Sequence, residues 1–246
     1  MHNSPTSLVS PAEYSPLEFT QEMNDRTLTR FLELISGFKI TALLESQDIV
    51  YGLWPDLTLA FTNDAWHRFA ADNGGEPAIS NEWRLGRNIL DAISEPLRSF
   101  YDMRYRSCLS LERPWEHVYE CSSDEMERMF HMTALPIGSG QAILVVNSLR
   151  IEKPMTRESA EPLESRYRNR YGMAIQCAHC RRFRRAELEA TWDWMREWVR
   201  SPLENTSHSI CEPCLGFYYA HYIGGEHLPK PTSTILPEDG RDEPDL

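Results

Sequence analysis

The chain has 246 residues, enough for one sizeable core and a small second module, and its 37 acidic residues outnumber its 25 basic residues to give a formal net charge of −12. This acidic balance argues against broad electrostatic attraction to nucleic acid or to membrane surfaces, so we expect neither as a partner. The longest apolar run, residues 142–146, is far too short to span a membrane and has the composition of a buried strand.

The N-terminal region predicts a disordered end followed by a helix. Residues 1–15 are rich in Ser, Pro and Asn, and we expect them to be disordered. A helix is expected over 16–37, with an apolar stripe that suits packing on the protein's own core, the simpler interpretation, or on a second copy in a homodimer. The stripe consists of Phe19, Met23, Leu28, Phe31, Leu32, Leu34 and Ile35.

The compartment is expected to be the reducing cytoplasm. The N-terminus has no basic region followed by an apolar one, so no secretory signal is visible. Two of the six cysteines, Cys108 and Cys121, stand alone in the sequence, as free thiols do in a reducing compartment.

Residues 38–153 predict two strands, a block of helices and three further strands. The pattern of short apolar segments and turn residues places strands over 49–54, 57–61, 115–121, 128–135 and 141–149, and helices over 63–73 and 96–111. This order predicts a five-stranded antiparallel sheet with helices across one face, which is an α+β fold.

Two motifs in this region resemble those of PAS sensor domains. They are LTLAFTNDAW at 57–66, where a strand runs into an Asn-capped helix, and LGRNI at 85–89, which is similar to the loop before the family's long helix. The resemblance implies a sensor domain over 38–153 with a cavity for a small ligand, which the sequence does not identify. Histidine can coordinate haem iron, so three residues are candidate haem ligands: His67, His117 and His131. A lone His on a strand or helix is, however, more often structural.

A polar, Pro-bearing linker is expected over 154–172, and a module with two cysteine pairs over 173–222. Each pair places two thiolates on one tight turn, and two such turns supply the four ligands of a closed tetrahedral metal site. We therefore expect a structural Zn²⁺ ion held by Cys177, Cys180, Cys211 and Cys214.

Other uses of these cysteines fit the neighbouring residues less well. Haem attachment requires a His directly after the second Cys of a pair, where the chain has Arg181 and Leu215. Iron sites with four thiolates usually have Gly at these positions, and disulfides require an oxidising compartment. His179 and His208 are close enough in sequence to replace a thiolate, but with four cysteines present we expect them beside the site or on the surface.

The segment 173–222 resembles a small zinc-binding module found at the ends of bacterial PAS and two-component signalling proteins. The resemblance rests on the two cysteine pairs and on the stretch WDWMREW at 192–198 between them. Helical spacing in that stretch would leave Trp194 and Trp198 on a face available for docking to the sensor domain or a partner.

A dense basic cluster lies within the module, at Arg181, Arg182, Arg184 and Arg185. The last two stand where the similar modules commonly have acidic residues and Gly. Because no helix-turn-helix pattern accompanies the cluster, we expect it to contact an acidic protein partner or the acidic tail, residues 223–246, which is expected to be disordered. The alternative is a zinc-containing transcriptional regulator that contacts nucleic acid through this cluster.

No catalytic group of residues is visible. The chain has no phosphate-binding Gly-rich loop and no nucleophile elbow, and a zinc ion closed by four thiolates lacks the open position that metal catalysis requires. The sequence therefore predicts a non-catalytic bacterial signalling or regulatory protein, in which a PAS-like sensor domain acts on a zinc-bound protein-interaction module.

Overall fold

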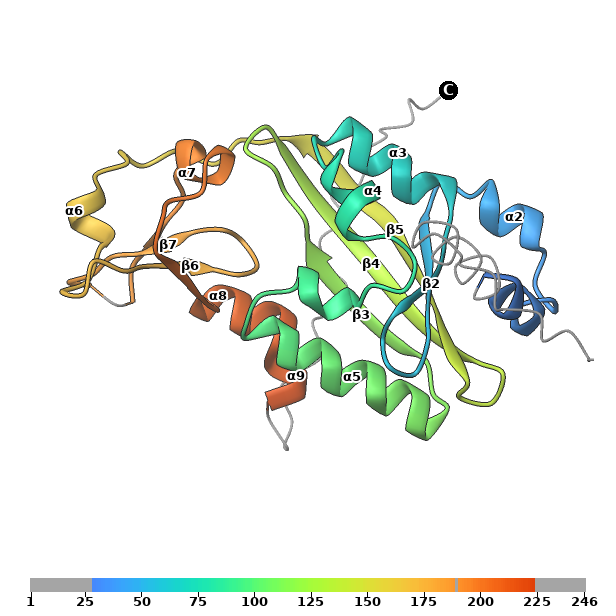
Figure 1. Cartoon of the computed structure of the whole chain (residues 1–246). Coiled ribbons are helices and arrows are strands. Elements are labelled where there is room, and N and C mark those ends of the chain that lie inside the picture. Colours follow the sequence, from blue (N-terminus) through green and yellow to red (C-terminus); the bar gives the residue numbers. More distant parts are fainter. Residues whose placement is uncertain (1–27, 189, 224–246) are drawn as a thin grey trace, which may run out of the picture.

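The computed structural model describes residues 28–188 and 190–223, which form a larger and a smaller β-sheet (Figure 1). The expected disordered N-terminus, the first part of the expected N-terminal helix and nearly all of the expected tail lie outside the described residues. Within the described part, no helix combines the length and apolar composition needed to cross a bilayer.

The larger sheet is antiparallel, with five strands in the order β2-β1-β5-β4-β3, which confirms the predicted α+β fold. Its strands are β1 (Ile49–Leu53), β2 (Leu59–Thr62), β3 (Trp115–Glu120), β4 (Met126–Ile137) and β5 (Ala142–Pro154). The first hairpin joins the last three strands through pairing of β1 with β5. Strands β4 and β5 extend beyond the predicted ranges because charged pairs across them, such as Arg128 with Glu152 at 2.7 Å, hold their polar ends together.

Helices cover one face of this sheet, as expected (Figure 1). They are α3 (Asp64–Asp72), α4 (Ala78–Glu82), the 3₁₀ turn η1 (Ile89–Ala92) and α5 (Leu97–Leu111); the short α2 (Ile40–Leu44) precedes the sheet. The predicted cap of α3 is present, because Asn63 Oδ1 accepts from the backbone N–H of Trp66 at 3.2 Å. The same oxygen accepts from the N–H of Val50 at 3.0 Å, which fixes the start of α3 to β1.

The opposite face of the sheet is also covered, which the sequence analysis did not predict. Residues 28–34 are helical, and Phe31 and Ile35 are fully buried against this face. Gly52 of β1 makes room for them, since a Cβ at this position would lie 2.1 Å from Cζ of Phe31. The described part of the N-terminal apolar stripe therefore packs on the protein's own core rather than presenting a surface to a second copy.

The smaller sheet has the strand order β8-β7-β6-β9, with β6 and β9 parallel. Its strands are β6 (Ala174–Cys177), β7 (Phe183–Arg184), β8 (Trp192–Asp193) and β9 (Thr206–Ser209). Around it lie α6 (Glu164–Tyr167), α7 (Arg196–Arg200), α8 (Glu212–Cys214), the π-helical turn η2 (Leu215–Tyr219) and α9 (Ala220–Ile223).

The predicted helical stretch 192–198 is helical only from Arg196, where α7 begins, because residues 192–193 form β8. Asp193 lies in strand β8, where its carboxylate accepts from Arg185 at 2.6 Å and from the Tyr167 hydroxyl at 2.8 Å, and this holds the segment extended. Trp194 and Trp198 are only 4% and 5% exposed: Trp198 packs in the core of the smaller unit, whereas Trp194 packs with Val199 and with Met155, which directly follows β5.

The expected linker is partly structured. Tyr167, in α6, is 1% exposed and packs edge-on against Trp198 at 5.3 Å between ring centroids. Because this ring lies in the core of the smaller unit, the ordered C-terminal unit includes residues that precede 173.

Candidate functional site

The parallel pairing of β6 with β9 brings the two cysteine pairs together. Cys177 ends β6 opposite Ser209 at the end of β9, so the turn that follows each strand leaves the sheet at the same edge. The first turn is closed by the N–H of Arg181 donating to the Cys177 carbonyl at 3.1 Å. In the second, Cys211 is the residue before α8 and Cys214 ends that helix.

All four cysteines are buried, and their sulfur atoms lie within 4.8 Å of one another. Cys180 Sγ and Cys211 Sγ are 3.6 Å apart, far longer than the about 2 Å of a disulfide bond. A tetrahedral zinc ion with Zn–S bonds of about 2.3 Å separates its sulfurs by about 3.8 Å, close to this distance. The backbone N–H of Cys211 also points at Cys177 Sγ at 3.4 Å, as expected for stabilising a thiolate. The four residues fit one metal ion.

Without a cation, the four thiols cannot all ionise together. Hydrogen bonding from Cys180 lowers the pKa of Cys177, whereas hydrogen bonding to Cys177 raises the pKa of Cys211 and of Cys214 well above the usual range of a thiol. A divalent cation removes this competition, because it stabilises every thiolate at once.

The two histidines near the cysteines lie outside the group of four sulfur atoms. His179 stacks on Tyr218 with the ring centroids 3.9 Å apart, and its Nε2 accepts from the backbone N–H of Glu120 at 3.4 Å. Burial lowers the pKa of His179 to about 4, so its ring is neutral at pH 7. His208 lies in β9 opposite Gln176.

An ion pair connects the first cysteine turn to the larger sheet. Glu120, at the end of β3, pairs with Arg157 at 2.8 Å, and the side chains are only 7% and 16% exposed. Arg157 also lies 3.6 Å from Glu127 of β4, and its Nη1 donates to the Cys180 carbonyl at 3.5 Å. One arginine therefore contacts both the sheet and a metal-binding turn.

Aromatic rings connect the second cysteine turn to the larger unit. The helical segment after Cys214 carries Tyr219, which packs edge-on against Phe100 of α5 with the centroids 5.0 Å apart. One turn further on, Tyr222 accepts from Trp115 Nε1 at 3.1 Å and donates to the Glu116 carbonyl at 3.1 Å. Both cysteine turns are thus linked to the larger unit.

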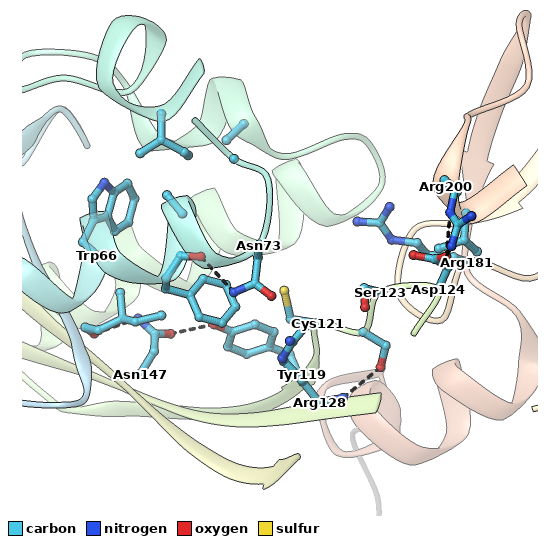
Figure 2. A pocket seen from close by; sticks show the side chains of 18 of the residues that line it. Trp66, Asn73, Tyr119, Cys121, Ser123, Asp124, Arg128, Asn147, Arg181 and Arg200 are labelled. Carbon is cyan, nitrogen blue, oxygen red and sulfur yellow. Dashed lines mark hydrogen bonds and ion pairs between the residues drawn. The ribbon is translucent and has the colours of Figure 1, made fainter. Parts of the chain in front are cut away.

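A pocket of about 740 Å³ lies where the two units meet (Figure 2). From the larger unit it is lined by the sheet, α3 and the loop after β3, and from the smaller unit by Arg181, Val199 and Arg200. Figure 2 shows Arg181 and Arg200, with Asp124, on the opposite side of the pocket from Trp66 and Asn147. The apolar part of the wall is formed by Ile49, Tyr51, Trp66, Phe69, Ile79 and Val199.

Polar groups of Tyr119, Asn147 and Asn73 in the pocket wall are paired within the protein, whereas the buried Trp66 Nε1 has no hydrogen-bond partner among the described residues. The Tyr119 hydroxyl donates to Asn147 Oδ1 at 2.9 Å, and Asn147 Nδ2 donates to the Ile49 carbonyl at 3.4 Å. Asn73 Nδ2 donates to the Phe69 carbonyl at 2.8 Å. The inner wall therefore offers mainly apolar surface.

The other histidines named from the sequence are not grouped into a ligand site. His67 lies 3.3 Å from Thr62 Oγ1, and His131 lies 3.6 Å from the carboxylate of Glu116. His117 is buried among aromatic rings beside Tyr219, outside the pocket.

The sequence analysis missed the pocket residues of the C-terminal unit. Arg181 was treated as part of a basic cluster, yet it lines the pocket, while Arg185 is held by Asp193 in the smaller unit. One signal pointed to Arg181, because it stands directly after a metal-binding pair, where Gly is the usual residue.

No known family model matches this chain, and its sequence matches no curated protein. The phage VqmA–DPO complex aligns with 52% of this chain and 56% of its own at 13% identity and a TM-score of 0.35. An RNA-binding light-oxygen-voltage receptor aligns with 60% of this chain and 36% of its own at 17% identity and a TM-score of 0.34. The PAS domain of an HTR-like protein from Haloarcula marismortui aligns with 54% of this chain and 98% of its own at 19% identity and a TM-score of 0.30.

The aligned part spans little more than half of the first of these structures and about a third of the second. At such identities and scores the likeness concerns the fold alone.

Proposed function

We propose that this is a non-catalytic, cytoplasmic bacterial signalling or regulatory protein, in which a small molecule bound by a PAS-like sensor domain acts on a zinc-stabilised module that binds a protein partner. One observation carries the proposal: the wall of the pocket is shared between the two units, with Arg181 beside a metal-binding turn on one side and Trp66 on the other. A ligand there contacts both units, so it favours the arrangement in which they close around it.

Zinc is the metal we assign to the four cysteines. Four thiolates at tetrahedral spacing suit zinc, and all four positions are filled by protein, which leaves no open position for substrate. The ion supplies folding free energy to a unit whose single sheet of two-to-four-residue strands encloses only small apolar clusters.

The nucleic-acid alternative has less support, because three of the four arginines lie at different sites. Arg181 lines the pocket between the units, Arg184 lines a separate hollow beside Tyr171, and Arg185 is bound to Asp193. A protein that binds the phosphate backbone of nucleic acid needs its cationic side chains on one continuous surface.

Native mass spectrometry of the protein purified from its own host tests the proposal directly. We expect one zinc ion and one small molecule per chain. N-phenyl-1-naphthylamine, a neutral dye that fluoresces in apolar sites, should bind the ligand-free protein with one-to-one stoichiometry, and Ala92→Trp, which adds bulk at the pocket lining, should abolish this binding. If the dye does not bind the wild-type protein, or binds the variant equally well, the pocket is not a ligand site and the proposal fails.

A further inference from the structure

Among the described residues, the pocket is lined by one arginine that has no ion-pair partner. Three arginines and a single carboxylate, Asp124, are among its lining residues. Arg128 is paired with Glu152 at 2.7 Å, and Arg200 with Asp124 at 2.6 Å. Within residues 28–188 and 190–223, no carboxylate forms an ion pair with Arg181. This guanidinium places a positive charge at the pocket, although the chain as a whole has a net charge of −12.

The backbone of Arg181 is held by the metal-binding turn. Its N–H donates to the Cys177 carbonyl at 3.1 Å, and its carbonyl accepts from Gln176 Nε2 at 3.3 Å. The turn therefore fixes the position of the Arg181 Cα, from which the side chain extends, directly beside Cys180.

This position is an unfavourable one for any residue with a side chain. Arg181 has φ 61°, in the left-handed region that Gly adopts freely and other residues adopt at a cost. Gly would satisfy the backbone better, so the presence of Arg indicates that the side chain has a use that offsets the strain. Of the non-Gly residues with positive φ in the described part of the chain, Arg181 is the one that lines the pocket.

We infer that the pocket binds a small molecule with an apolar body and one anionic group, and that Arg181 binds the anionic group. The apolar body lies against Trp66 and Phe69, beside the paired side chains of Asn73 and Tyr119, and the anion meets the Arg181 guanidinium at the boundary between the units. This inference rests on the proposed function, because it names the chemistry of the ligand for the same pocket. It also makes the metal-binding turn a direct participant in ligand recognition.

A matched pair of dyes tests the inference. 8-Anilino-1-naphthalenesulfonate has an apolar ring system with a sulfonate, and N-phenyl-1-naphthylamine has the same rings without it. With ligand-free, zinc-loaded protein, we expect Arg181→Gln to weaken binding of the sulfonate dye about tenfold and to leave binding of the neutral dye within about twofold. Arg182→Gln, which removes the same charge one residue away and outside the pocket lining, should change neither.

Arg181→Gly separates the side chain from the backbone. It should lose the preference for the sulfonate dye just as Arg181→Gln does, while raising the melting temperature because Gly relieves the left-handed strain. All variants should retain one zinc ion per chain.

The outcomes are distinguishable. An unchanged affinity for the sulfonate dye in both Arg181 variants overturns this inference while binding of the neutral dye still supports the pocket as a ligand site. Equal weakening of both dyes would also overturn it, because Arg181 would then act only on the shape of the pocket. Failure of the wild-type protein to bind the neutral dye removes the proposed function itself.

Discussion

Trp115, in the larger sheet, donates its indole N–H to the hydroxyl of Tyr222, 107 residues further along the chain, at 3.1 Å. The same hydroxyl donates to the carbonyl of Glu116, so a single side chain of the C-terminal segment is held by two consecutive residues of β3. The segment that carries Tyr222 follows Cys214 directly through η2 and α9. We therefore expect a disturbance of the second cysteine turn to reach the edge strand β3 of the five-stranded sheet.

Removing this hydroxyl should loosen the contact between the units without unfolding either one. Tyr222→Phe leaves the Trp115 N–H without its acceptor, and we expect a loss of about 1 kcal/mol in the free energy of unfolding. Hydrogen exchange should increase in residues 215–223. Tyr171→Phe is the matched control, because Tyr171 is 73% exposed, and it should change stability by less than about 0.5 kcal/mol. Equal effects of the two substitutions would show that the Trp115 contact adds nothing.

Zinc content is the second prediction. Metal analysis of protein kept reduced should give about one zinc per chain, because the four sulfurs form one group. Cys177→Ser or Cys214→Ser should lose the ion and melt the smaller sheet, while the five-stranded sheet, with its own two cores, stays folded. Hydrogen exchange resolves the two sheets.

Cys121→Ser serves as the control for these cysteine variants, because Cys121 is exposed and lies outside the group of four. It should retain the full zinc content. Iron in place of zinc, or cooperative loss of both sheets in Cys177→Ser, would contradict the account.

The ion pair between Glu120 and Arg157 should contribute to stability because both side chains are largely buried. Glu120→Gln leaves the arginine with only Glu127, at 3.6 Å, and we expect a loss of about 2 kcal/mol by urea unfolding of zinc-loaded protein. Glu127→Gln removes the longer contact and should cost less than about 1 kcal/mol. The reverse order of effects would mean that Arg157 is held chiefly by β4.

Gly52 should tolerate no side chain, since a Cβ there meets the ring of Phe31. Gly52→Ala should displace that ring and lower the free energy of unfolding by about 1–3 kcal/mol. Gly37→Ala is the control, because a Cβ at Gly37 meets nothing within 4 Å, and it should be nearly neutral. A neutral Gly52→Ala would show that the N-terminal helix does not pack on the sheet as described.

The sequence predicted those features that depend on local patterns. Successive side chains of β1 point to opposite faces of the sheet, so Tyr51 and Leu53 face one core while Val50 faces the other. The cap of α3 was predictable because Asn63 precedes a helical run, and the spacing of the cysteine pairs indicated the metal-binding group before any geometry was known.

Features that depend on contacts between distant residues were not predictable. The stretch 192–198 has helical spacing of apolar residues, but hydrogen bonds from Tyr167 and Arg185 to Asp193 hold its first two residues in strand β8. The pocket is similar in this respect, because it joins Arg181 to Trp66 across more than a hundred residues of sequence. The one local indication of this pocket in the sequence is Arg181, which directly follows Cys180 where Gly is the usual residue.

The central claim is that the metal-binding turn and the sensor pocket act as one unit, and dye binding before and after metal removal tests it most directly. Zinc is removed with a chelator, its loss is verified by metal analysis, and the affinity for 8-anilino-1-naphthalenesulfonate is measured in both states of the same preparation. We predict that zinc loss weakens binding about tenfold or more and that restoring zinc restores the affinity, since a turn that positions Arg181 depends on the ion. An affinity that is the same with and without zinc would contradict the account.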